Sequence, residues 1–107
     1  MAGFVRGWAE KEGKEVERML RGEPRWASMY QARVPALLLE QPDLSPADRE
    51  MLAVLISPTK VCQYISEAPT VNAIRDRREY VAEGLKRCTV LAVEFGLARF
   101  GGGSESA

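Results

Sequence analysis

The chain has 107 residues, of which 46% are hydrophobic and 28% charged, and its 15 basic residues balance 15 acidic ones. This composition is typical of one soluble globular domain, and it excludes a collagen, a disordered chain and a membrane span. The sequence contains no histidine, which excludes a Ser-His-Asp triad and every metal site with a histidine ligand. A net charge of zero also argues against a dedicated polyanion binder.

The two cysteines, Cys62 and Cys88, are too few for a zinc site or a disulfide-rich scaffold. Residues 1–15 carry three glutamates and lack the apolar core of a signal peptide. The longest apolar runs have six residues, against the roughly 20 of a transmembrane helix. We therefore expect a cytoplasmic protein with two reduced, buried thiols and with no cofactor, metal or membrane contact.

Residues 3–21 are predicted to form the first helix. Apolar residues recur there at helical spacing, at Val5, Trp8, Ala9, Val16, Met19 and Leu20. Gly7 and Gly13 weaken the prediction by about 1 kcal/mol each relative to alanine. Gly22 and Pro24 indicate the end of this helix.

Residues 25–40 show a second helical pattern, which contains Pro35. Proline has no backbone N–H and clashes with the preceding turn, so it splits or kinks a helix. We expect a break near Arg33–Val34 and a short second piece that continues through Glu40.

A capping signal follows at Ser45-Pro46-Ala47-Asp48. Serine fits the N-cap, proline the first helical position and aspartate the third. This helix is expected to continue to about Ser57, with Leu52, Leu55 and Ile56 facing inward. Thr59 is then expected to cap a short helix that ends near Glu67.

Residues 70–99 contain no proline, and Ile74, Val81, Cys88 and Phe95 recur every seven residues. This pattern predicts one long helix, or two helices stacked end to end near Gly84. Its C-terminal half is expected to pack on the first helix or on another chain, and Gly96 to fray its last turn. The sequence thus predicts an all-α bundle of four to five helices over residues 1–100, with a flexible tail at 101–107.

Residues 46–80 allow a DNA-binding interpretation. Their predicted helices and apolar spacing are similar to a helix-turn-helix motif, although the turn lacks a glycine and is about one residue short. Four basic side chains are the candidate contacts to nucleic acid or to an acidic partner: Lys60, Arg75, Arg77 and Arg78. Acidic neighbours at Asp76 and Glu79 weaken the local field.

A protein-binding interpretation uses the apolar residues instead. The candidate helix-packing or oligomer interface consists of Trp8, Ile74, Val81, Cys88, Leu91 and Phe95. We expect a non-enzymatic adaptor, regulator or assembly subunit that makes helix-mediated contacts with a second copy of itself or with another protein. DNA binding through residues 46–80 is the alternative.

Catalysis has little support in the sequence. The acidic pairs Glu12/Glu15 and Glu79/Glu83 and the single Asp48 are interpreted as solvated helix faces. A thiol sensor at Cys88 is a third hypothesis, because Lys86 and Arg87 adjoin it.

Overall fold

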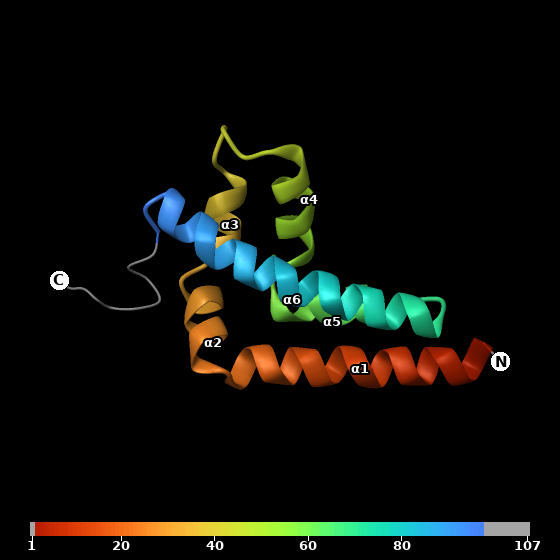
Figure 1. The fold of residues 1–107 in the computed structure, drawn as a ribbon. Coiled ribbons are helices and arrows are strands. Elements are labelled where there is room, and N and C mark those ends of the chain that lie inside the picture. Colours follow the sequence, from red (N-terminus) through yellow and green to blue (C-terminus); the bar gives the residue numbers. More distant parts are fainter. Residues whose placement is uncertain (1, 98–107) are drawn as a thin grey trace.

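A computed structural model describes residues 2–97 of the chain, and within them it contains six α-helices and no strand (Figure 1). Their bounds are α1 Ala2–Gly22, α2 Pro24–Gln31, α3 Val34–Leu39, α4 Pro46–Val54, α5 Pro58–Ser66 and α6 Val71–Glu94. The predicted all-α architecture with a long C-terminal helix is confirmed. Five of the six helices have eight residues or more, in line with the predicted four to five, and the sixth, α3, is the short second piece expected after the break in residues 25–40. The tail predicted at 101–107 lies outside the described residues.

The break predicted in residues 25–40 is confirmed between α2 and α3. Arg33 takes a left-handed backbone conformation with φ of 63°, and Pro35 lies in the first turn of α3. Proline is tolerated there because the first backbone N–H groups of a helix have no partner within it. The proline thus places the start of a new helix, which changes the chain direction at this point.

Serine and threonine side chains cap the later helices. Ser45 Oγ accepts the Asp48 backbone N–H at 3.1 Å, as predicted for α4. The α5 helix is capped by Ser57, whose Oγ accepts the Lys60 N–H at 3.1 Å, so the cap predicted at Thr59 is wrong. The reason is Pro58, which takes the first helical position and makes the preceding residue the cap.

The α4 helix ends earlier than predicted. Its last residue is Val54, and the following chain turns at Leu55 and Ile56. Leu55 is fully buried, whereas Ile56 is 36% exposed, so the prediction that Ile56 faces inward is wrong. A helical pattern cannot be extended across the turn that ends the helix.

The α6 helix is continuous through Gly84, which excludes two helices stacked at that point. An added Cβ at Gly84 would lie 3.0 Å from side-chain atoms of Met51 and Leu55, so the missing side chain lets α4 approach closely. Gly96 terminates the helix with φ of 78°, and the Leu97 N–H donates to the Ala92 carbonyl. The Gly96 N–H also donates to the Val93 carbonyl, and the two bonds together form a Schellman cap. Gly96 therefore ends the helix in a defined way where fraying was expected.

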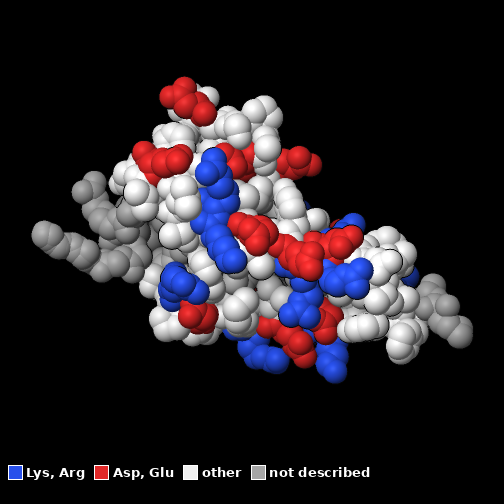
Figure 2. Space-filling model, in the orientation of Figure 1, with Lys and Arg blue, Asp and Glu red and all other residues white. Residues whose placement is uncertain are grey.

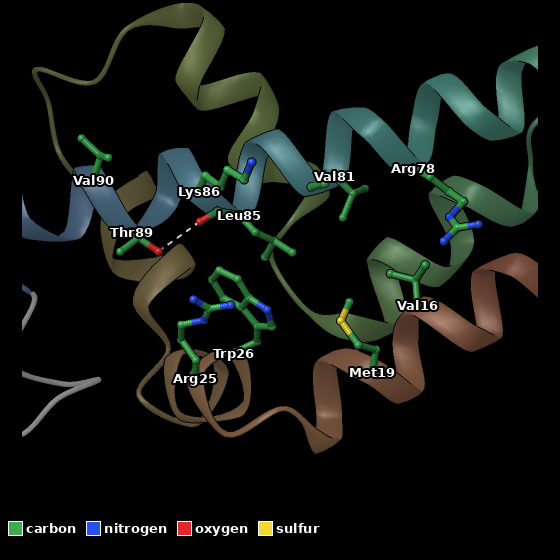
Figure 3. Close-up of a pocket in the computed structure, with 11 residues that line it drawn as sticks. Val16, Met19, Arg25, Trp26, Arg78, Val81, Leu85, Lys86, Thr89 and Val90 are labelled. Atoms are coloured by element: carbon green, nitrogen blue, oxygen red, sulfur yellow. Dashed lines mark hydrogen bonds between the residues drawn. The ribbon is translucent and has the colours of Figure 1, made fainter.

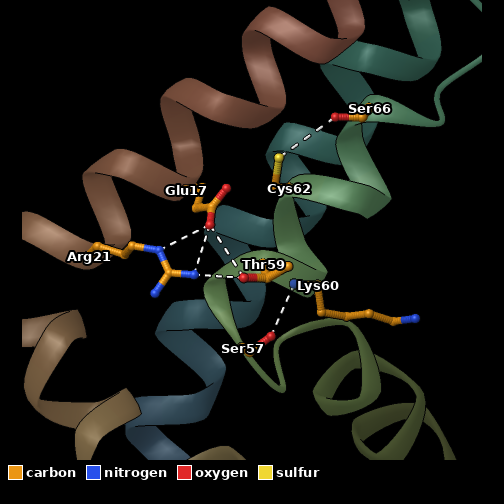
Figure 4. Close-up of polar contacts among 7 residues, drawn as sticks. All are labelled: Glu17, Arg21, Ser57, Thr59, Lys60, Cys62 and Ser66. Atoms are coloured by element: carbon orange, nitrogen blue, oxygen red, sulfur yellow. Dashed lines mark hydrogen bonds and ion pairs between the residues drawn. The ribbon is translucent and has the colours of Figure 1, made fainter.

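The α1 helix packs antiparallel along α5 (Figures 1 and 4), and Gly13 of α1 faces α5 where no side chain would fit. An added Cβ at Gly13 would lie 2.5 Å from Ser66 Oγ and 2.6 Å from the Cys62 carbonyl oxygen. Nearer the end of α1, Arg21 donates to Thr59 Oγ1 at 2.6 Å and to Glu17 at 2.8 Å. The buried face of α1 is therefore covered by α5.

The C-terminal half of α6 packs on α2, α3 and α4, where packing along α1 was one expectation (Figure 1). The other expectation, packing on another chain, stays a prediction. The Cys88 thiol lies 3.4 Å from Met29 Sδ of α2, and Arg87 pairs with Asp48 of α4. The largest fully buried side chains of this core include Leu20, Leu38, Leu52, Leu55, Ile65 and Leu91.

Candidate functional site

A groove runs between α1 and α6, with α5 behind it and α2 across one end (Figure 1). It has two compartments, of about 510 Å³ and 460 Å³, which meet at Arg78 and Ala82. We name them after their tryptophans: the Trp26 compartment lies next to α2, and the Trp8 compartment lies near the start of α1. Both volumes fall in the range of ordinary ligand and peptide sites.

The Trp26 compartment has apolar walls and a basic rim (Figure 3). Val16 and Met19 point into it from α1, and Val81 and Leu85 face them from α6. Three side chains supply positive charge, and no acidic side chain lines the compartment; they are Arg25, Arg78 and Lys86. Each of the three also has a carboxylate of the chain within 4 Å that does not line the compartment: Glu23, Glu12 and Glu83 respectively.

Two of these cations are weakly held by the protein itself. Lys86 is 74% exposed and lies 3.8 Å from Glu83, while Arg25 is 68% exposed and lies 3.7 Å from Glu23. Both distances are longer than those of a good hydrogen-bonded ion pair. The Arg25 guanidinium also stacks 4.4 Å above the centre of the Trp26 ring. A partner's carboxylate could therefore approach either cation without first breaking a strong internal pair.

An ion pair between Glu12 and Arg78 crosses the groove where the two compartments meet. Glu12 also accepts the indole N–H of Trp8 at 3.2 Å, which fixes its orientation. The Trp8 compartment contains two acidic and two basic side chains, so its charge is balanced: Glu12, Glu79, Arg75 and Arg78. The exposed apolar groups Trp8 and Val71 lie at its outer end.

The structure disperses the four basic residues predicted for nucleic acid. Arg77 donates to the Tyr64 carbonyl of α5 at 2.6 Å and stacks on that ring, away from the groove. Arg78 pairs with Glu12, and Arg75 donates to Asn72 Oδ1 at 2.9 Å. Lys60 is exposed on α5, beside the contacts of Figure 4. On the face drawn in Figure 2, basic and acidic side chains lie next to one another and form no broad basic area.

Most of the predicted helix-packing row faces the interior of this chain. Ile74, Val81, Cys88 and Leu91 are at most 3% exposed. Phe95 packs against the main core, whereas Ile74 belongs to a smaller cluster with Ala9 and Ala68. Trp8 differs, because it is 39% exposed at the groove. The sevenfold row therefore packs helices within the chain, and two of the row's residues, Ile74 and Val81, also line the groove, as does Trp8.

Both cysteines are free and poorly suited to thiol chemistry. Burial raises the pKa of the Cys88 thiol to about 12, which suppresses the reactive thiolate at neutral pH. Cys62 is half-buried and not fully buried as expected, and desolvation also raises its pKa. The positive neighbours of Cys88 in sequence do not activate it, because Arg87 pairs with Asp48 instead.

The carboxylates expected to be solvated include two that are engaged in the fold. Glu12 pairs with Arg78, and Asp48 accepts both Nε and Nη2 of Arg87 at 3.1 and 3.0 Å. The Arg87 guanidinium lowers the pKa of Asp48 below its usual value. Over residues 2–97, no three cysteine or carboxylate side chains converge as metal ligands, and no helix has the length and apolar character to cross a bilayer.

Most residues that line the groove were not among the contacts predicted from the sequence, and Met19, Arg25, Trp26, Ala82 and Lys86 are examples. Part of the signal was present, because helical geometry places Arg75, Arg78, Ala82 and Lys86 along one stripe of α6. The α1 and α2 residues that face this stripe depend on tertiary packing. Comparison of the chain with protein-family models, curated proteins and solved structures found no match.

Proposed function

We infer that this protein is a non-enzymatic adaptor or regulator that binds a helical segment of another protein in the groove between α1 and α6. The observation that carries this proposal is the unfilled apolar groove itself. Met19, Val90, Trp8 and Val71 are 39–46% exposed along it, and no segment among residues 2–97 covers them. Exposed apolar groups that line a concavity are typical of protein-binding surfaces.

The shape of the groove favours a helix as the occupant. Its α6 wall extends from Val71 to Val90, which is about 28 Å of helix at 1.5 Å per residue. An amphipathic helix of similar length could lay its apolar face between α1 and α6 and bury the exposed side chains. The protein would then act by holding such a segment, which is the work of an adaptor or an assembly subunit.

DNA binding through residues 46–80 has less support. A recognition helix must present several cations to phosphates and base edges on one accessible face. Arg77 and Arg78 lie on different sides of α6, and each is already bound to another part of the protein. We therefore keep DNA binding as an alternative outcome of the experiment below.

Ala82 offers a sharp test, because it lines both compartments and is itself exposed. Ala82→Trp should fill the groove without disturbing the core. Ala53→Trp is the matched control, since Ala53 is an exposed position on α4 and lines no described pocket. Helices selected from a display library of amphipathic sequences should bind the wild-type protein and Ala53→Trp, and binding to Ala82→Trp should fall at least tenfold.

Two outcomes would contradict the proposal: failure to enrich any helix, or enriched helices that bind Ala82→Trp as well as the wild type. Light scattering on a sizing column, with and without a DNA duplex, separates the alternatives. Co-elution with duplex at low salt that is lost at high salt would favour DNA binding. A dimer of the wild type that Ala82→Trp disrupts would assign the groove to a second copy of the chain.

A further inference from the structure

The charge of the groove changes along its length, and this difference bears on what the groove binds. Three cations and no acid line the Trp26 compartment, whereas the Trp8 compartment has two of each sign. A bound helix would therefore meet a positive rim beside Trp26 and a neutral rim beside Trp8. Complementary charge at such rims mainly affects specificity and association rate.

The Glu12–Arg78 ion pair adds a second constraint, because it separates the apolar parts of the two compartments. The α6 residues that line one compartment are displaced by about 12 Å along the helix from those that line the other. The α1 residues give a similar displacement, from Trp8 and Glu12 to Val16 and Met19, of about 11 Å. In a bound helix this distance corresponds to about seven residues, or two turns.

Resting on the function proposed above, we propose that the partner segment is an acidic amphipathic helix with two apolar anchors about seven residues apart. One anchor enters the Trp26 compartment, flanked by carboxylates that face Arg25 and Lys86. The other enters the Trp8 compartment, where its flanks are uncharged or mixed. The basic rim thereby sets which half of the partner helix occupies which compartment.

The Glu12–Arg78 pair would lie under the middle of the bound helix. Arg78 is about half exposed, whereas the Glu12 side chain is 14% exposed and is held by Trp8 as well. A partner carboxylate can thus share Arg78 while Glu12 stays in place. Because the Lys86–Glu83 pair is long and exposed, Lys86 can turn to the partner at little cost. Arg25 is also exposed, and a partner carboxylate can reach it while it stays stacked on Trp26.

Two labelled peptides of about 18 residues, long enough for about 27 Å of helix, test the proposal by fluorescence anisotropy. Both carry leucine anchors seven residues apart on the same alanine-rich backbone. One has glutamates around the first anchor, and the other has lysines there. With Arg25 and Lys86 available at the rim, the acidic peptide should bind about tenfold more tightly at low salt, and the ratio should shrink as salt screens the exposed charges.

Lys86→Glu should reduce the preference for the acidic peptide several-fold. Lys60→Glu is its matched control, because Lys60 is exposed on α5, lines no described pocket and changes the net charge equally. Thermal melts of both variants show whether the fold is retained, which is expected because both side chains are exposed. A preference that Lys60→Glu lowers as much as Lys86→Glu would reflect net charge alone and would overturn the assignment to the rim.

The outcomes distinguish this inference from the function on which it rests. Equal binding of both peptides that Ala82→Trp abolishes would refute the acidic partner and leave the groove as the binding site. Library helices that bind in the groove without acidic flanks would have the same meaning. If neither the peptides nor any library helix binds, both the inference and the proposed function are wrong.

Discussion

Replacing Gly13 with alanine should loosen the packing of α1 against α5. The added methyl group would lie 2.5 Å from Ser66 Oγ and 2.6 Å from the Cys62 carbonyl oxygen, whereas ordinary contact begins near 3.4 Å. The serine hydroxyl can rotate away. The carbonyl belongs to the α5 backbone and cannot, so the two helices must separate or tilt locally.

The expected cost follows from two opposing effects. Overpacking of a tight contact costs about 1–3 kcal/mol. Alanine regains up to about 1 kcal/mol, because glycine is the poorer helix former. We therefore expect Gly13→Ala to lower the free energy of unfolding by about 1–2 kcal/mol, which in a domain of this size lowers the melting temperature by several degrees.

Gly7→Ala is the matched control on the same helix. Gly7 is exposed, and an added Cβ would have no neighbour within 4 Å, so the substitution should stabilise the protein by about 0.5–1 kcal/mol. Urea unfolding followed by circular dichroism measures both variants. If Gly13→Ala is stabilised as much as Gly7→Ala, the close approach of α1 and α5 is wrong.

Three further substitutions or measurements test other contacts. Arg87→Gln should lower the free energy of unfolding at neutral pH, because it removes the partner that depresses the Asp48 pKa in the folded state. This loss of stability should fade as pH falls below about 4, where Asp48 becomes protonated in the unfolded chain, and unfolding curves at several pH values measure it. Gly96→Ala should cost about 1 kcal/mol in a chemical melt, because φ is 78° there, and an unchanged midpoint would argue against the left-handed cap. In the native protein, Cys88 should react with a thiol reagent only as fast as the fold opens, whereas half-buried Cys62 should react sooner; mass spectrometry of timed samples would expose the opposite order.

Local chemistry made several parts of the fold predictable. Pro35 predicted the break between α2 and α3, and Ser45 predicted the start of α4, because each acts within one or two turns of its own position. The cap at Ser57 escaped prediction although it follows the same rule, since Thr59 offered a competing hydroxyl two residues later. Thr59 instead binds Arg21, a partner 38 residues away that no local pattern reveals.

The meaning of Gly13 could not be read from the sequence. Glycine is a weak helix former, so within its own helix Gly13 is only a source of instability. Its actual role depends on Cys62 and Ser66, which lie about fifty residues later in the chain. A glycine in a helix has opposite consequences at Gly7 and at Gly13, and only the neighbouring helix distinguishes them.

The grouping of arginines shows the same limit in another form. Arg75, Arg77 and Arg78 are close in sequence, but successive helical positions differ by about 100°, so Arg77 points away from the other two. Arg78 and Lys86 are eight residues apart and nevertheless line the same compartment. Residues form a patch on a helix when they are three or four positions apart and so lie on one side of it. Residues that are merely adjacent in sequence point in different directions.

The groove exists because α5 occupies the buried face of α1. Ala9, Gly13 and Leu20 lie on that face, and Trp8, Glu12 and Met19 lie about a quarter-turn away, toward α6. With α1 fixed against α5, its contacts with α6 include the Glu12–Arg78 pair and the small apolar cluster around Ile74. The close approach at Gly13 and the open groove therefore both result from the packing of α1 on α5. It follows that Gly13→Ala should also weaken helix binding, because any shift of α1 away from α5 changes the width of the groove.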